Sequence, residues 1–153
     1  MRRLEIVLRV RTLTRDFSNS IFREQDIIDF INEGINRFKQ VLPVLKSTPK
    51  LLVADQEPKP IPEEYQHLLA VYASSRCFSQ DERHYQATTL MNEFEVKLDE
   101  LKQAIQNGDI VIVDDNGVPI EDTSSVMDYV DLSAYWRTSS SYDEGEFDVV
   151  GDV

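Results

Sequence analysis

The sequence predicts a mainly α-helical protein, with a small helical bundle in residues 1–108 and an extended acidic arm in residues 109–153. Three observations lead to this fold class. Residues 24–42 repeat apolar side chains at helical spacing, residues 61–83 are apolar on nearly every side, and charge is divided unevenly along the chain. At 153 residues the chain can form one domain with a substantial core.

The net charge of −12 becomes informative when it is divided along the chain. Residues 1–50 hold 10 Lys/Arg and 6 Asp/Glu, residues 51–108 hold 5 and 10, and residues 109–153 hold 1 and 12. Such an asymmetry indicates two physically different parts. A pI near 4.5 disfavours nucleic-acid binding through surface charge, because acidic side chains repel phosphate.

Targeting and redox signals are absent from the sequence pattern. No apolar run approaches the ~20 residues that span a bilayer, so no membrane partner is expected. Arg2 and Arg3 precede a stretch broken by further charges, which is not a secretory pattern. Cys77 is the only cysteine, so an intrachain disulfide and a cysteine metal cluster are excluded and a reducing compartment is the default.

Residues 4–13 are ambiguous. Apolar residues alternate with others at a period of two, which slightly favours a strand, although a helix would give a broad, imperfect apolar side. Residues 16–20 are turn-forming. The clearest helix follows at residues 24–42, where Gly34 lies inside the apolar stripe. A helix-interior glycine costs ~1 kcal/mol relative to alanine, so we expect another helix to approach closely there.

The middle of the chain joins a proline-rich connector to the helix that we expect at the centre. Five prolines within residues 43–62 exclude a helix there, although residues 51–54 could pair briefly as a strand. The helix of residues 61–83 would begin with Pro62 in its first turn. Because it is apolar nearly all round, other elements must surround it. Arg76 on this helix must pair with a carboxylate or reach a subunit boundary.

The last helix of the predicted bundle has a narrow apolar seam. Asp81 is a reasonable N-cap, and Gly108 fits the C′ position that ends the helix. The seam leaves a polar flank free, and its residues are Ala87, Met91, Phe94, Leu98, Leu101 and Ile105.

The acidic arm combines apolar residues without helical spacing. Residues 110–120 resemble a β-hairpin with an Asn-Gly turn, so the pattern allows short β segments in the arm. Beyond them, aromatic side chains have no face of their own on which to bury. We expect this segment to become ordered when it docks on a partner, through the candidate anchors Tyr129, Tyr135, Trp136, Tyr142 and Phe147.

The sequence contains no recognisable catalytic motif, and we expect neither an enzyme nor a cofactor. His67 and His84 have no placed carboxylate partners for a metal, and Cys77 fits a small buried hydrophobe better than a nucleophile. The basic N-terminal cluster is the one counter-signal to the acidic charge. It could receive an acidic segment of a neighbouring copy, so with Arg76 the candidate subunit-interface residues are Arg9, Arg11 and Arg15.

Two segments carry a family likeness: RVRTLTRDFSNSIFREQDIIDFINEGINRFKQVLP and, after a proline-rich gap, IPEEYQHLLAVYASSRCFSQDERHYQATTLMNEFEVKLDELKQAI. Together they resemble the head–tail connector (adaptor) proteins of tailed bacteriophages over residues 4–107. The shared pattern is a turn with Phe22, an acidic amphipathic helix centred on residues 31–35, an Ile-Pro-x-x-Tyr start to an Ala/Ser-rich helix, and Asp81-Glu82 before a long final helix.

This resemblance implies a four-helix subunit in which residues 4–13 are helical. It implies a homo-oligomeric ring of twelve copies that docks beneath the portal protein, with a tail or stopper protein below. The ring would extend the DNA channel in the virion neck, after assembly in the host cytoplasm. DNA would pass without sequence-specific binding, which suits an acidic lining that repels phosphate. In this family the C-terminal segment grips the portal.

An alternative from another class is a DNA-mimic inhibitor, whose acidic side chains imitate phosphates and occupy a nucleic-acid-binding protein. It would explain the charge but not why the acid is concentrated in one tail. Mixing with portal protein separates the two hypotheses, because only a connector should assemble into rings.

Overall fold

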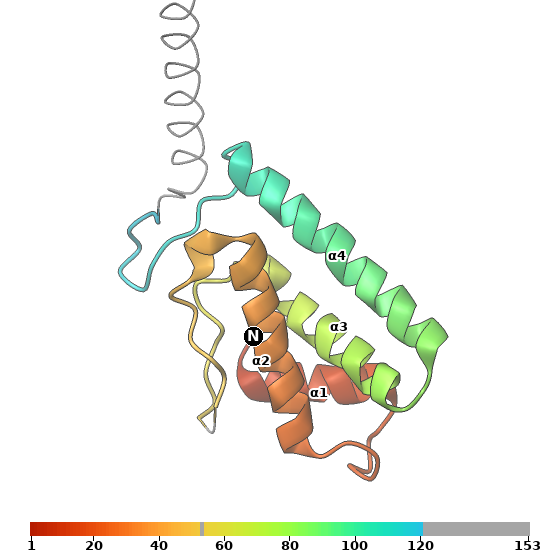
Figure 1. Cartoon of the computed structure of the whole chain (residues 1–153). Coiled ribbons are helices and arrows are strands. Elements are labelled where there is room, and N and C mark those ends of the chain that lie inside the picture. Colours follow the sequence, from red (N-terminus) through yellow and green to blue (C-terminus); the bar gives the residue numbers. More distant parts are fainter. Residues whose placement is uncertain (53, 121–153) are drawn as a thin grey trace, which may run out of the picture. The chain divides into compact units, whose positions relative to one another are not determined.

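The computed structural model describes residues 1–52 and 54–120, and it has four α-helices in this part of the chain (Figure 1). They are α1 (Arg3–Thr14), α2 (Glu24–Val41), α3 (Glu63–Gln80) and α4 (His84–Gln106), with a 3-10 turn at Pro43–Leu45 after α2. The predicted mainly α-helical class, with four helices, is confirmed. No strand is assigned within these described residues.

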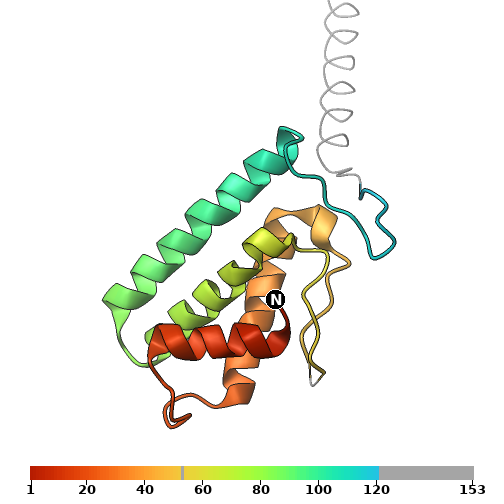
Figure 2. The same ribbon diagram turned by 180° about the vertical axis from the view of Figure 1, so that it is seen from behind.

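Helix α3 lies at the centre of the bundle, as its composition predicts. It contacts α1, α2 and α4, and the two views in Figures 1 and 2 show these helices on different sides of it. Helices α3 and α4 run antiparallel as a hairpin. The buried residues of α3 point in every direction around the helix and are Gln66, Leu68, Leu69, Ala70, Val71, Ala73, Ser74, Ser75, Cys77 and Phe78.

The close crossing of α2 and α3 is centred on Gly34. A Cβ atom added at Gly34 would lie 3.2 Å from Leu69 Cδ2 and 3.2 Å from Tyr72 Cδ1. The glycine therefore offsets its poor helix propensity by allowing the two helices to approach. The other inward positions of α2 are buried as the spacing predicts, and they are Ile27, Ile28, Ile31, Ile35 and Phe38.

Helix α4 packs on α3 through the predicted narrow seam. Its buried residues are Ala87, Phe94, Leu98 and Leu101. The Phe94 ring meets Phe38 and Tyr72 edge-on, at centroid distances of 5.7 Å and 5.0 Å, an arrangement that aromatic quadrupoles favour. The Ser75 hydroxyl donates a 2.7 Å hydrogen bond to the Ala87 carbonyl and joins the two helices near their connection.

The strand that periodicity favoured for residues 4–13 is wrong, because this segment forms α1. Ile6, Val7 and Val10 are buried on one side of that helix, while Leu4 and Leu8 remain half-exposed. The alternation was misleading because apolar residues occupy both sides of α1. A period of two is therefore compatible with a helix whose inner face packs against α2 and α3.

Three finer predictions also change. Residues 51, 52 and 54 form no strand, and a single 3-10 turn interrupts the connector that was expected to contain no helix. Pro62 is the N-cap of α3 rather than a first-turn residue. Asp81 ends α3 as its C-cap, and Arg83 takes the N-cap of α4. The Asp81 carboxylate instead forms an ion pair with Arg83, in which Oδ2 and Nε are 3.0 Å apart.

The chain after α4 first returns to the helices. Gly108 has a φ of +80°, which fits its expected role after the helix end. Residues 110–120 make one antiparallel bridge, between Val113 and Pro119, and the Asp114 carboxylate accepts the Asn116 and Val118 N–H groups. Ile112 is buried against the core. The compact unit therefore runs from Met1 to Ile120, twelve residues past the expected boundary.

Replacing Gly34 with leucine should destabilise the bundle by about 1–3 kcal/mol through overpacking at the α2–α3 crossing. The matched control is Asn36→Leu, which changes an exposed position of the same helix. Both substitutions suit a helix, so a difference between them reports the crossing. Urea unfolding followed by circular dichroism measures it, and equal stability of the two variants would contradict a tight contact at Gly34.

Candidate functional site

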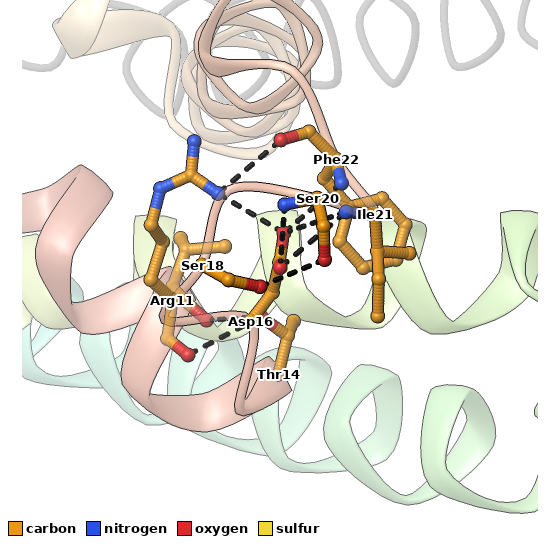
Figure 3. A network of polar contacts seen from close by, with 8 residues as sticks. Arg11, Thr14, Asp16, Ser18, Ser20, Ile21 and Phe22 are labelled. Carbon is orange, nitrogen blue, oxygen red and sulfur yellow. Dashed lines mark hydrogen bonds and ion pairs between the residues drawn. The ribbon is translucent and has the colours of Figure 1, made fainter.

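The turn after α1 is organised around Asp16, as Figure 3 shows. The Asp16 carboxylate accepts hydrogen bonds from the N–H groups of Ser20 at 3.1 Å, Ile21 at 3.3 Å and Phe22 at 3.0 Å. Arg11 Nη1 lies 3.1 Å from the same carboxylate and also donates to the Phe22 carbonyl at 3.2 Å. One buried acid therefore fixes the path of the chain between α1 and α2.

The electrostatics of this turn favour an ionised Asp16. The Phe22 N–H is the largest cause that lowers the pKa of the carboxyl from its ordinary value of 3.8, and the Ser20 and Ile21 N–H groups and the Arg11 charge act in the same direction. Burial acts in the opposite direction and raises the pKa, but the net pKa of Asp16 remains lowered. The negative charge is thus held by donors already in place.

Holding the turn in this way separates its apolar residues. Phe22 is buried in the core, whereas Phe17 and Ile21 are 71% and 54% exposed. Because Asp16 ties down the backbone on both sides, these two side chains are presented on a fixed loop. Apolar groups displayed on a rigid element are suited to contact with another protein.

The four candidate interface arginines have different surroundings. Arg11 is buried within its own chain, so we withdraw it from the interface candidates: its charge already has a partner in Asp16. Arg9 and Arg15 are exposed. Arg76 Nε pairs with Glu33 Oε2 at 3.1 Å, and its guanidinium lies 5.7 Å from the Phe30 ring centroid, so it joins α3 to α2 at the surface.

The outer surface of α1 combines apolar side chains with the exposed polar residues Glu5, Arg9 and Thr12. Leu4 and Leu8 are 50% and 56% exposed and lie one helical turn apart. A shallow cleft of about 450 Å³ lies at the far end of α1, and its lining includes Leu13, Arg15 and Arg83. The sequence did not reveal this surface, because the period of two in residues 4–13 slightly favours a strand. The signal that was available is the presence of apolar residues on both sides of the helix.

Asp16 and Phe17 were not recognised from sequence as site residues. Asp16 stood in a stretch identified only as turn-forming, and Arg11 was assigned to another role. A usable signal was the Asp16-x-Ser18-x-Ser20 pattern directly after a helix, because aspartate favours hydrogen bonds to backbone N–H groups a few residues ahead.

The proposed arm residues lie outside the described residues, and this holds for Tyr129, Tyr135, Trp136, Tyr142 and Phe147. Within residues 1–52 and 54–120, no group of His, Cys, Asp and Glu side chains is arranged to hold a metal ion. Among the helices of the same part, none is long and apolar enough to cross a bilayer. Cys77 is buried, and burial raises the pKa of its thiol to about 12.

Comparison with known proteins adds no relative to this description. A scan against protein-family models, a search of curated proteins and a search of solved structures each find no match to the chain.

Replacing Asp16 with asparagine should lower the free energy of unfolding at pH 7 by about 2 kcal/mol, since it weakens several charge-assisted hydrogen bonds and leaves Arg11 unpaired. The contribution of Asp16 is complete above its unfolded pKa of 3.8 and disappears as the pH falls through the lower folded pKa. The difference between parent and variant should therefore shrink in strong acid. Asp29→Asn, on the exposed side of α2, is the control, and a pH-independent difference would contradict the assignment.

The Cys77 thiol should resist alkylation in the folded protein. At pH 8 a thiol with a pKa of about 12 is almost entirely protonated, and burial also blocks access. Iodoacetamide labelling followed by mass spectrometry should proceed at the rate of unfolding, whereas a cysteine introduced at exposed Ser18 should be labelled at once. Equally fast labelling at both positions would reopen a nucleophilic role for Cys77.

Proposed function

We propose that this chain is a structural adaptor of a tailed-bacteriophage neck, which assembles as a ring under the portal protein and extends the DNA channel toward the tail. The observation that carries the proposal is a set of exposed apolar side chains on a well-packed helical unit, namely Leu4, Leu8 and Phe17, each of which is at least half-exposed. Such surfaces serve association between proteins. The resemblance of residues 4–107 to adaptors gives this association its biological setting.

The distribution of charge supports the same function. Residues 1–120 carry 15 Lys/Arg and 19 Asp/Glu, whereas residues 121–153 carry 1 and 9. The helical unit is therefore only mildly acidic. A DNA mimic needs a dense array of acids on a folded surface, and this unit has no such excess. A channel component needs only weak repulsion of DNA, so that the passenger remains mobile.

Within this proposal, residues 121–153 attach the subunit to the portal, and the proposed ring of twelve copies stands in the virion neck above a tail or stopper protein. The arm would use aromatic anchors for binding energy and its acids for encounter. The role is structural and needs neither catalysis nor a cofactor.

Trp136→Ala in the full chain should leave α1–α4 folded and weaken attachment to portal by ~2 kcal/mol or more, as expected for an aromatic anchor. Trp136→Phe should retain most of the binding. A chain that ends at Ile120 should remain folded, because Ile112 and Ile120 pack on the core, and should fail to attach. Sedimentation of each variant with purified portal, combined with electron microscopy of the complexes, measures attachment.

Asp128→Asn and Asp131→Asn together should give a milder defect that depends on salt, since acidic side chains around the anchors would act mainly on the rate of encounter. Full attachment of the chain ending at Ile120 would remove the arm hypothesis. Failure of the full chain to bind any portal at all would count against the adaptor function itself.

A further inference from the structure

The cleft of about 450 Å³ at the end of α1, here called the α1-end cleft, has no role in the packing of the helices. Figures 1 and 2 show this end of the helix beside the connection between α3 and α4. Leu13, Phe78 and Leu90 supply the apolar part of its lining. Its volume is in the range of pockets that hold small organic molecules.

The charge of the α1-end cleft differs from that of the chain as a whole. Arg15 and Arg83 line it, and among the described residues no Asp or Glu does. A larger cleft of about 700 Å³ beside the proline-rich connector has the opposite character, because its lining holds four carboxylates and two cationic side chains. In a chain with a net charge of −12, the α1-end cleft therefore concentrates positive charge, which favours an anionic ligand.

Arg83 is already held in position by its own chain. Its Nε lies 3.0 Å from Asp81 Oδ2, and its guanidinium carbon lies 6.0 Å from the Phe78 ring centroid. The ion pair uses Nε, so both Nη groups are left to bind an anion. Asp81 and Glu82 belong to the same connection but do not line the cleft. A guanidinium held in this way loses little freedom when it binds phosphate.

Arg15 has a backbone conformation that ordinarily favours glycine. It directly follows α1 with a φ of +59°, and this left-handed conformation is unfavourable for a residue that has a Cβ. The Asp16 turn holds the chain on this path. Within residues 1–52 and 54–120, Arg15 makes no ion pair. Neither the backbone nor a charge partner in that part of the chain therefore explains why arginine occupies this position.

The rim of the α1-end cleft carries groups that suit a planar ring. Tyr85 is 82% exposed and lines the cleft together with Gln86 and Thr89. An exposed aromatic ring is available to stack on a nucleobase, and an amide side chain offers donors and an acceptor to its edge. Arginine binds phosphate through parallel N–H groups. A nucleotide carries the groups that complement all three features.

We propose that the α1-end cleft binds a nucleotide through its 5′-phosphate and its base. Arg15 and Arg83 would bind the phosphate, and Tyr85 would stack on the base. A free nucleoside monophosphate and the 5′-phosphorylated end of a single strand both present this chemistry. The inference goes beyond the proposed function, and it depends neither on ring formation nor on attachment to portal.

Titration calorimetry of the full chain with adenosine 5′-monophosphate (AMP) tests the site. AMP should bind saturably, whereas adenosine and inorganic phosphate should each bind at least about tenfold more weakly, because each lacks half of the recognised groups. A 5′-phosphorylated single-stranded oligodeoxyadenylate is compared with the same strand carrying a 5′-hydroxyl. Tighter binding of the phosphorylated strand than of AMP assigns the site to strand ends, and the reverse order assigns it to free nucleotides.

Arg15→Gly separates binding from folding, because it removes the guanidinium and places at the left-handed position the residue that suits it. Thermal unfolding should show no loss of stability, while the affinity for AMP should fall at least about tenfold. Arg83→Gln should weaken AMP binding to a similar extent. The matched control is Arg9→Gln, which removes an exposed arginine of α1 outside the cleft and should bind AMP like the parent.

Three outcomes would overturn the nucleotide site. The first is a parent chain that shows no saturable binding of AMP, and the second is an Arg15→Gly variant with parental affinity. The third is inorganic phosphate that binds as tightly as AMP, since the base would then contribute nothing. An equal loss of affinity in Arg9→Gln and Arg15→Gly would also contradict the site, because it would report overall charge rather than the cleft.

Discussion

The need to bury α3 on every side is the constraint on which the rest of the structure depends. A helix with Leu68, Leu69, Ala70 and Val71 in succession has no sector that favours water, so its neighbours must cover it all round. Helices α1, α2 and α4 do so from different directions. The small residues of α3 and Gly34 of α2 allow close approach, and this places the Phe38–Phe94–Tyr72 cluster between three helices.

Covering α3 also determines which surfaces remain exposed. Each surrounding helix uses one side against α3, and no further helix of residues 1–52 and 54–120 lies behind it, so residues on its far side reach solvent. For α4 this is unremarkable, because its seam is narrow and its flanks are mostly polar. For α1 it is not, because Leu4 and Leu8 are apolar and half-exposed. Within the described residues, α3 is covered on every side, whereas the outer side of α1 faces solvent.

The Arg11–Asp16 pair holds together the turn between α1 and α2. Buried ion pairs contribute little net stability, but removing one partner leaves an uncompensated charge. The useful consequence is geometric: Asp16 gathers three backbone N–H groups, and the loop therefore buries Phe22 while it displays Phe17.

The sequence by itself determined the helices whose apolar pattern is unambiguous. The stripe of α2, the all-round apolar character of α3 and the seam of α4 each predict one kind of burial, and Gly34 predicted a close crossing because no other role justifies glycine there. The state of residues 4–13 could not be decided in this way, since a helix with apolar residues on both sides also satisfies a strand period. Only tertiary packing chose the helix, by burying Ile6 and Val10 while leaving Leu4 and Leu8 exposed. The burial of Arg11 was likewise decided by the tertiary structure, because an arginine on an exposed helix face and one beneath a loop look alike in sequence. Its ion pair with Asp16 at the end of α1 holds it in the buried position.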